Sequence, residues 1–145
     1  MATADQEYRP IRELGRGGMG TVYLAEQVRL GRLVAVKTLL PGALANADLA
    51  ARFCREAELL RTLSHPNLVR LLDARLDGDN PFLVFEYIEE SEPLDAVIER
   101  GSLGRAAALA TISGVFEGLS HLHAKGILHR DIKPANILLD GSGTP

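Results

Sequence analysis

Short apolar runs separated by polar turns dominate the first part of the chain. They are rich in β-branched and aromatic residues, or they alternate between apolar and polar positions, as expected for β-strands. Glycine, proline, aspartate and asparagine occupy the breaks between them. The runs predict five strands, at residues 8–14, 21–25, 33–39, 68–76 and 82–88.

Between the third and fourth runs the periodicity changes to that of a helix. Asn46 or Asp48 is suited to cap it, and Pro66 lies just beyond its end. Glu56 falls on its apolar stripe, where an unpaired buried carboxylate would be strongly unfavourable. Lys37, on the preceding strand, is the candidate cation; the alternative is that the Glu56 carboxylate reaches water at the edge of the helix. The stripe consists of Leu49, Phe53, Leu60 and Leu63.

The rest of the chain is predicted to be mainly helical after an acidic connector at 89–93. A short helix is expected at 94–100 and a long one at 105–125. Gly114 and Gly118 in the long helix are tolerable if another helix packs closely there. Its apolar residues cover more than one face, with a main stripe of Leu109, Ile112, Phe116, Leu119 and Leu122.

Composition and charge limit the binding partners and the cellular location that are expected for this chain. The net charge is −3 and the sequence pI is about 5.8, which gives no indication of nucleic acid or of an anionic membrane surface as partner. No apolar run approaches the length of a membrane-spanning helix. One cysteine, Cys54, excludes an internal disulfide and fits a reducing compartment. We therefore expect a cytoplasmic location, either of the whole protein or of the cytoplasmic part of a membrane-anchored one.

The residues from His129 to Asn136 form a polar loop between an apolar pair at 127–128 and an apolar run at 137–139, both predicted as short strands. Rigidly flanked loops are where chemistry usually occurs. Asp131 is suited to accept a proton, Lys133 to hold a phosphate and Asn136 to bind a metal. The alternative is a solvated turn that carries charges without a function.

A glycine-rich segment follows the first strand, from Gly15 to Gly20, and fits the pattern G-x-G-x-x-G. A dinucleotide-binding fold requires a helix directly after these glycines. Here Thr21-Val22-Tyr23 follows, which predicts a strand, so the glycines form the turn of a hairpin. Such a turn lets backbone N–H groups approach a phosphate. A hairpin tip without a ligand is the alternative.

These features occur in one order along the chain: the glycine hairpin, Val34-Ala35-Val36-Lys37, a helical glutamate 19 residues later, a Phe-Glu-Tyr-Ile strand end, and His-Arg-Asp with its following asparagine. Together they resemble the N-terminal part of a eukaryotic-like Ser/Thr protein kinase catalytic domain. Residues 17–20 and 52–57 most resemble the bacterial members.

The resemblance implies an α+β, protein-kinase-like fold. A small antiparallel five-stranded sheet with one helix would form the N-lobe, residues 1–88. Residues 89–145 would form the hinge connector and the first, mainly helical part of the C-lobe, through the catalytic loop.

The resemblance also implies a site for ATP and Mg²⁺. Lys37 would hold the α- and β-phosphates and be oriented by Glu56. Phe85 would be the gatekeeper beside the adenine, whose edge would bond to the Glu86 carbonyl and the Ile88 amide. The remaining nucleotide-binding residues would be Leu14, the backbone at Gly15, Gly17 and Gly20, the adenine roof at Val22 and Ala35, and its floor at Leu138.

For phosphoryl transfer to a protein Ser or Thr hydroxyl, the resemblance assigns Asp131 to the substrate proton, Lys133 to the transferred phosphate and Asn136 to one Mg²⁺. Arg130 would mark the subclass controlled by phosphorylation of the activation loop.

One departure from the family pattern is that Asp-Phe-Gly does not occur, and Pro145 lies nine residues beyond Asn136. We therefore expect a kinase segment truncated before that motif, inactive alone and self-associating through its long apolar helix. A non-catalytic nucleotide-binding or scaffold module is the alternative. A small-molecule phosphotransferase is a third reading, but such enzymes rarely carry Lys133-Pro134.

Overall fold

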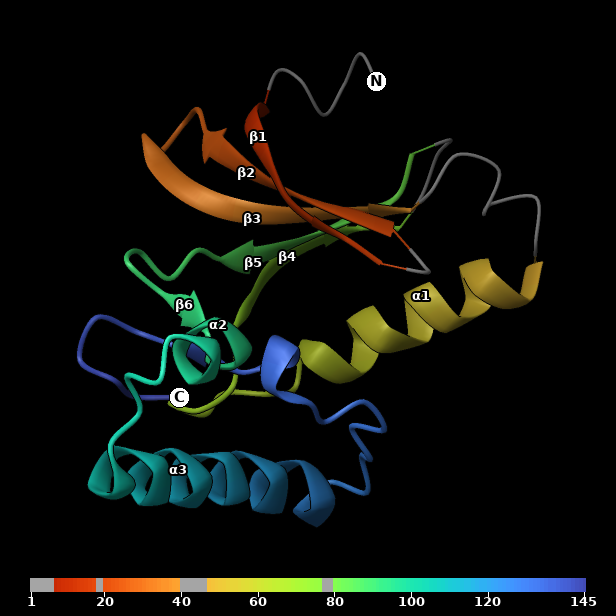
Figure 1. Ribbon diagram of the computed structural model, residues 1–145. Coiled ribbons are helices and arrows are strands. Elements are labelled where there is room, and N and C mark those ends of the chain that lie inside the picture. Colours follow the sequence, from red (N-terminus) through yellow and green to blue (C-terminus); the bar gives the residue numbers. More distant parts are fainter. Residues whose placement is uncertain (1–6, 18–19, 40–46, 77–79) are drawn as a thin grey trace. The chain divides into compact units, whose positions relative to one another are not determined.

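The structure, a computed structural model, describes residues 7–17, 20–39, 47–76 and 80–145. The chain divides into two compact units (Figure 1). The first unit comprises Met1–Leu63 and Val69–Tyr87, and the second comprises Ser64–Leu68 and Ile88–Pro145. The short segment Ser64–Leu68 therefore belongs to the second unit, although both of its neighbours along the chain belong to the first.

The described residues of the first unit form a five-stranded sheet and one helix, as predicted. Its strands pair in the order β1-β2-β3-β5-β4, and every pair is antiparallel. Helix α1 (Ala47–Leu60) lies between β3 and β4 in the sequence. The strands are β1 (Tyr8–Arg16), β2 (Gly20–Gln27), β3 (Arg32–Leu39), β4 (Leu71–Arg75) and β5 (Phe82–Glu86).

The two faces of this sheet carry separate apolar clusters. On one face, Phe53 and Ala57 of α1 pack with Leu83 of β5, and Leu60 packs against them. The Phe53 and Leu60 positions of the predicted helical stripe therefore face the sheet, while the side chain of Leu49 lies outside the described part. The cluster on the other face consists of Tyr8, Ala25, Val34, Val36, Phe82 and Val84. Alternation along the strands produces this division, because successive side chains project from opposite faces.

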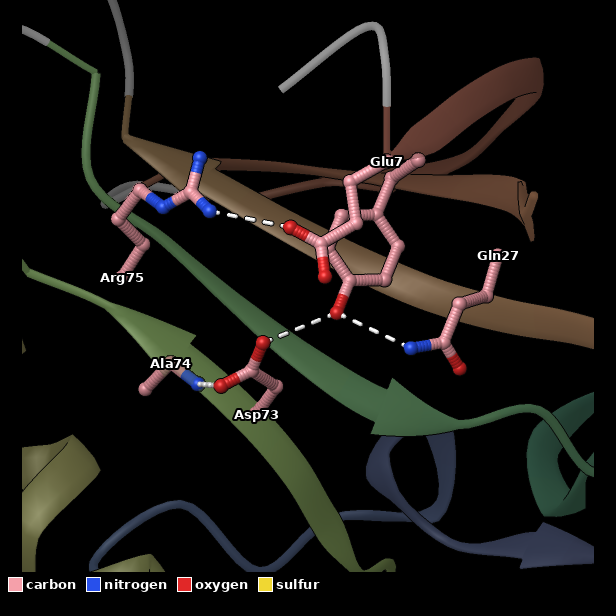
Figure 2. A network of polar contacts seen from close by, with 6 residues as sticks. Glu7, Gln27, Asp73, Ala74 and Arg75 are labelled. Carbon is pink, nitrogen blue, oxygen red and sulfur yellow. Dashed lines mark hydrogen bonds and ion pairs between the residues drawn. The ribbon is translucent and has the colours of Figure 1, made fainter. Parts of the chain in front are cut away.

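A polar network joins the two edges of the sheet (Figure 2). The Tyr8 hydroxyl on β1 donates to Asp73 Oδ2 on β4 at 3.0 Å and accepts from Gln27 Nε2 at 3.4 Å. Arg75 of β4 forms an ion pair with Glu7 at 3.0 Å. In a flat sheet β1 and β4 would be about 19 Å apart, so a direct side-chain bond requires the sheet to curl strongly.

The aromatic ring of Phe82 contacts two members of this network, Tyr8 and Arg75. The Tyr8 ring is buried and packs edge-on against Phe82, with 5.6 Å between the ring centroids. The Arg75 guanidinium lies over the same Phe82 ring, 5.3 Å from its centroid. Phe82 therefore supports both polar links between the edge strands.

The second unit contains helices α2 (Leu94–Glu99) and α3 (Arg105–Ala124), close to the predicted bounds. A two-stranded sheet pairs β6 (Glu92–Pro93) with β7 (Leu138–Leu139). A short 3₁₀ helix, η2 (Pro134–Asn136), precedes β7. Leu94 and Val97 of α2 pack with Leu139 of β7, so this small sheet and α2 share one apolar cluster.

Several sequence-based assignments are wrong, among them the end of the fifth strand, which lies at Glu86 rather than at residue 88. Strand β4 begins at Leu71 rather than residue 68, because the Leu68 N–H donates to the His65 carbonyl in a turn, at 3.1 Å. No strand forms at 127–128, because the Ile127 N–H is bonded to the Leu122 carbonyl at the end of α3. Residues 92–93, predicted to be connector, form β6 instead.

A loop, and not another helix, packs against the glycines of α3. A Cβ atom at Gly118 would lie 3.0 Å from the Asn67 carbonyl oxygen. One at Gly114 would lie 2.6 Å from Pro145 Cγ and 2.9 Å from the Asn67 side-chain nitrogen. The two glycines therefore let the segment Ser64–Leu68 approach the backbone of α3. They are buried together with Thr111 and Leu122 of the same helix.

The opposite face of α3 is apolar and exposed. Leu109, Ile112 and Phe116 are 60, 52 and 63 % exposed, which confirms an exposed apolar patch on this helix. Leu122, which the sequence placed on the same stripe, is instead buried on the face that carries Gly114 and Gly118. Within the described residues, no helix combines the length and apolarity that crossing a membrane requires.

We predict that the Tyr8 hydroxyl makes the stability of the chain sensitive to alkaline pH. Burial, and then the hydrogen bond to Asp73, raise the pKa of Tyr8 well above its usual value of about 10. When the pH rises above about 10, Tyr8 loses its proton in the unfolded chain but retains it in the folded chain. The free energy of unfolding therefore falls as the pH rises further. At about pH 8, Tyr8→Phe should lower that free energy by about 1 kcal/mol, through the lost hydrogen bond.

Urea unfolding at about pH 8 and pH 11 measures both effects. The difference between the wild type and Tyr8→Phe should shrink at the higher pH. Tyr23→Phe, on β2 and outside the network, is the control. A difference that stays constant between the two pH values would contradict the prediction.

Candidate active site

The sheet of the first unit carries the residues expected to hold a nucleotide. Lys37, in β3, lies opposite Val22 of β2 and Leu83 of β5. Directly opposed residues in antiparallel strands project from the same face, and so does Ala35, two positions before Lys37. Val22, Ala35 and Lys37 are therefore side by side on the face where Leu83 packs with α1.

The glycine hairpin between β1 and β2 has two kinds of glycine. A Cβ atom at Gly20 would lie 2.0 Å from the Thr38 carbonyl oxygen, so close packing against β3 already requires glycine there. At Gly15 and Gly17 a Cβ atom would meet nothing within 4 Å. The Gly17 N–H donates to the Gly20 carbonyl at 2.9 Å, while residues 18–19 lie outside the described part of the chain.

Three more residues of the first unit belong to the set expected to bind the nucleotide: Leu14, Phe85 and Glu56. Leu14, near the end of β1, is 37 % exposed, and Phe85 is partly buried in the cluster beneath α1. Glu56 lies in α1, directly before the buried Ala57. The Glu56 side chain is outside the described part, so its pairing with Lys37 stays a prediction.

Hydrogen bonds hold the backbone around Glu86 and Ile88, the residues expected to contact adenine. In the first unit, the Glu86 N–H donates to the Arg70 carbonyl at 3.0 Å, and the Glu86 carboxylate accepts the Arg70 N–H at 2.7 Å. In the second unit, the Ser91 hydroxyl donates to the Ile88 carbonyl at 2.7 Å. Sequence reasoning missed Arg70 and Ser91, because neither residue type indicates such a backbone role.

In the second unit, Asp131 is held by two residues that follow it in the loop. Lys133 Nζ lies 3.1 Å from Asp131 Oδ2. Asn136 Nδ2 donates to both the carbonyl and the carboxylate of Asp131, each at 2.8 Å. The structure therefore brings together the three residues that the sequence singled out in this loop.

The backbone of this loop contributes to the arrangement. Arg130 has a φ of 64°, in the left-handed region that a residue with a side chain seldom adopts. The Asp131 N–H donates to His129 Nδ1 at 3.3 Å. Helix η2 then places Asn136 one turn beyond Lys133, whose carbonyl accepts the Asn136 N–H at 2.9 Å. Leu138 follows in β7, where it pairs with Pro93. The loop is thus tied at its start and at its end.

The electrostatics of the loop favour an ionised Asp131. The ion pair with Lys133, followed by the Asn136 hydrogen bond, lowers the pKa of Asp131 below its ordinary value. The carboxylate is exposed to solvent and acts only as an acceptor when ionised. It is therefore suited to accept a hydrogen bond, or a proton, from a substrate hydroxyl.

The residues present fit a magnesium ion that is bound mainly through phosphate. Asn136 uses its Nδ2 in both bonds to Asp131, so its Oδ1 is the atom with which it would bind a cation. Within the described residues, no three His, Cys, Asp or Glu side chains gather as a metal site. Magnesium commonly takes one or two protein ligands and completes its shell with phosphate and water.

Comparison with known proteins places these features in a family. The sequence pattern of the protein kinase domain matches residues 8–144. That match spans the glycine hairpin, Lys37, and the loop from His129 to Asn136.

Individual bacterial relatives agree. The chain is 46 % identical to the serine/threonine-protein kinase pkn2 of Myxococcus xanthus over 95 % of its own length and 16 % of the relative's. It is 38 % identical to the serine/threonine-protein kinase PrkC of Bacillus subtilis, over 94 % of its own length and 21 % of the relative's. It is 37 % identical to the serine/threonine-protein kinase PknL of Mycobacterium tuberculosis, over 98 % of its own length and 36 % of the relative's. The chain thus spans between about a sixth and about a third of the length of these relatives.

We predict that Lys133 is the main determinant of the low pKa of Asp131. Lys133→Met should raise the pKa of Asp131 towards its ordinary value, and Asn136→Ala should raise it less, because the Lys133 contribution is the larger. Titration of side-chain carboxyl carbons by NMR measures both changes.

Asp140 provides the internal control. Hydrogen bonds from Ser142 and Thr144 lower the pKa of Asp140, and Lys133 has no part in them. Its titration should be the same in both variants. An unchanged Asp131 titration in Lys133→Met would show that the ion pair does not form.

Proposed function

The chain belongs to the protein kinase domain family, and we propose that it forms the ATP-binding and catalytic-loop part of a Ser/Thr protein kinase. The observation that carries the proposal is the loop in which Lys133 and Asn136 both contact Asp131. A solvated turn without a function would not need two converging partners on one carboxylate, nor a left-handed residue just before it.

For the nucleotide, we propose that the first unit binds the phosphates and the adenine. The backbone at Gly15 and Gly17 would approach the phosphates, which is supported by the open space at both positions. Lys37 would hold the α- and β-phosphates, and Val22 and Ala35 on the same face would contact adenine. The rest of the proposed set comprises Leu14, Gly20, Glu56 and Glu86 of the first unit, and Ile88 and Leu138 of the second.

For the chemistry, we propose that Asp131 orients the hydroxyl of a substrate Ser or Thr and accepts its proton. Lys133 would neutralise charge on the transferred phosphoryl group, for which its position 3.1 Å from Asp131 is suitable. Asn136 would be a ligand of Mg²⁺. When bound, Mg²⁺ stabilises the charge that develops on the phosphate oxygens.

We propose that these 145 residues bind nucleotide but do not transfer phosphate by themselves. In kinases the principal magnesium carboxylate belongs to Asp-Phe-Gly, which does not occur in this sequence. A non-catalytic scaffold is the second candidate. Retention of Lys37, Asp131, Lys133 and Asn136 argues for a catalytic parent, because a binding module would need only part of this set.

A cytoplasmic location is proposed for the segment. ATP is available there, and the single Cys54 would stay reduced.

The proposed ATP site predicts magnesium-dependent nucleotide binding that requires Lys37. Titration of the 145-residue chain with ATP should show tighter binding with Mg²⁺ than without it. Lys37→Ala should weaken ATP binding by about tenfold or more, because it removes a charge-assisted contact to phosphate. Lys125→Ala, at the end of α3, removes the same charge elsewhere and should leave the affinity unchanged. Equal affinity with and without Mg²⁺, and in Lys37→Ala, would refute the site.

We also propose that two copies of the chain associate through the exposed face of α3. Leu109, Ile112 and Phe116 form one apolar stripe on this helix, and a second copy offers the same stripe. Phe116→Glu should therefore shift the chain towards monomer. Light scattering over a range of concentrations measures this shift.

Ser113→Glu is the matched control for this association. Ser113 is exposed on the same helix, and the substitution adds the same charge without removing an apolar side chain. It should disturb association less than Phe116→Glu does. A wild-type chain that remains a monomer at all concentrations would contradict the proposal.

A further inference from the structure

The end of β5 departs from ordinary strand pairing at one residue. In a hydrogen-bonded antiparallel pair, two opposed residues exchange both of their N–H···O=C bonds. Leu71 is opposite Phe85, so Arg70 and Glu86 are the next pair along. The Glu86 N–H donates to the Arg70 carbonyl at 3.0 Å, which is the first of the two bonds expected for such a pair.

The second bond goes to a side chain. The Arg70 N–H donates to Glu86 Oε1 at 2.7 Å, so the carboxylate occupies the position at which the Glu86 backbone carbonyl would normally accept. An ionised acceptor forms a shorter and stronger bond than a neutral carbonyl, so the carboxylate competes well for this N–H. The Glu86 carbonyl is thereby released from β4.

We propose that the Glu86 carboxylate is a positioning group that frees the Glu86 carbonyl to accept a hydrogen bond from the 6-amino group of adenine. This inference rests on the proposed function, in which that carbonyl contacts the base. It adds a reason for glutamate at this position: the side chain satisfies Arg70 so that the backbone oxygen can serve the ligand. The side chain itself would not touch the nucleotide.

The consequence is a preference for adenine that depends on a side chain facing away from the base. Without the carboxylate, the Arg70 N–H would turn to the Glu86 carbonyl and complete the ordinary pair. The carbonyl would then be a poorer acceptor for adenine. Contacts to the phosphates and to the ring faces would be unchanged.

Comparison of ATP with the triphosphate of purine riboside isolates this effect. The purine base has a hydrogen where adenine has its amino group and keeps N1 as an acceptor, so it loses only the bond to the Glu86 carbonyl. The wild-type chain should prefer ATP by about threefold to tenfold, the value of one hydrogen bond. In Glu86→Ala the preference should fall to about one, with the affinity for purine riboside triphosphate unchanged.

Two further variants separate the carboxylate bond from other causes. Glu86→Gln retains a side-chain oxygen that can accept the Arg70 N–H, so it should keep most of the preference. Arg70→Ala removes the guanidinium but keeps the backbone N–H, so it should behave as the wild type. The proposal is wrong if Glu86→Ala retains the preference or weakens both nucleotides equally, or if Arg70→Ala abolishes the preference.

A nucleotide-free measurement keeps this inference separate from the proposed function. NMR couplings across hydrogen bonds should connect the Arg70 nitrogen to the Glu86 side-chain carboxyl carbon in the wild type. In Glu86→Ala the same nitrogen should couple to the backbone carbonyl carbon of residue 86. A wild-type coupling to that backbone carbon would overturn the release of the carbonyl. If the wild type binds neither nucleotide, the proposed function fails, and the coupling alone decides whether the carbonyl is released.

Discussion

The position of β3 inside the sheet is the constraint on which the first unit depends. Pairing with β2 on one side and β5 on the other fixes the register of Lys37 against Val22 and Leu83. A shift by one residue would turn Lys37 to the face that contains the buried Val34 and Val36. Because burying a charged amine in that cluster is strongly unfavourable, the apolar pattern of β3 also selects the face of its lysine.

At two points in the first unit, side-chain hydrogen bonds join strands where backbone hydrogen bonds do not. Tyr8 and Asp73 link strands that are not neighbours, and they hold the sheet in a curled form that the strand order alone does not specify. The Glu86 carboxylate takes the place of a backbone acceptor at the end of β5. In the second case a polar side chain satisfies a backbone N–H where the regular ladder does not.

In the second unit, the geometry of the loop around Asp131 depends mainly on residues close to it in the sequence. Asp131 obtains both partners from the five residues that follow it, so the loop needs little long-range packing to set its geometry. In contrast, the segment Ser64–Leu68 reaches α3 only because Gly114 and Gly118 present bare backbone. These glycines lower the helix propensity by about 1 kcal/mol each, which the close contact offsets.

The sequence alone determined the five strands and the helix of the first unit, helices α2 and α3 of the second, and the three residues that meet in the loop. Local patterns carry this information: alternation in β3, a helical stripe in α1, and ordered motifs that resemble a kinase. Tertiary structure decided the rest. Strand β6 forms only because β7 lies beside it, and Arg70 and Ser91 matter through backbone contacts that no residue type announces. The glycines of α3 are a further example. From the sequence they indicated only that another part of the chain could approach the helix closely, and the structure shows that this part is a loop rather than a helix.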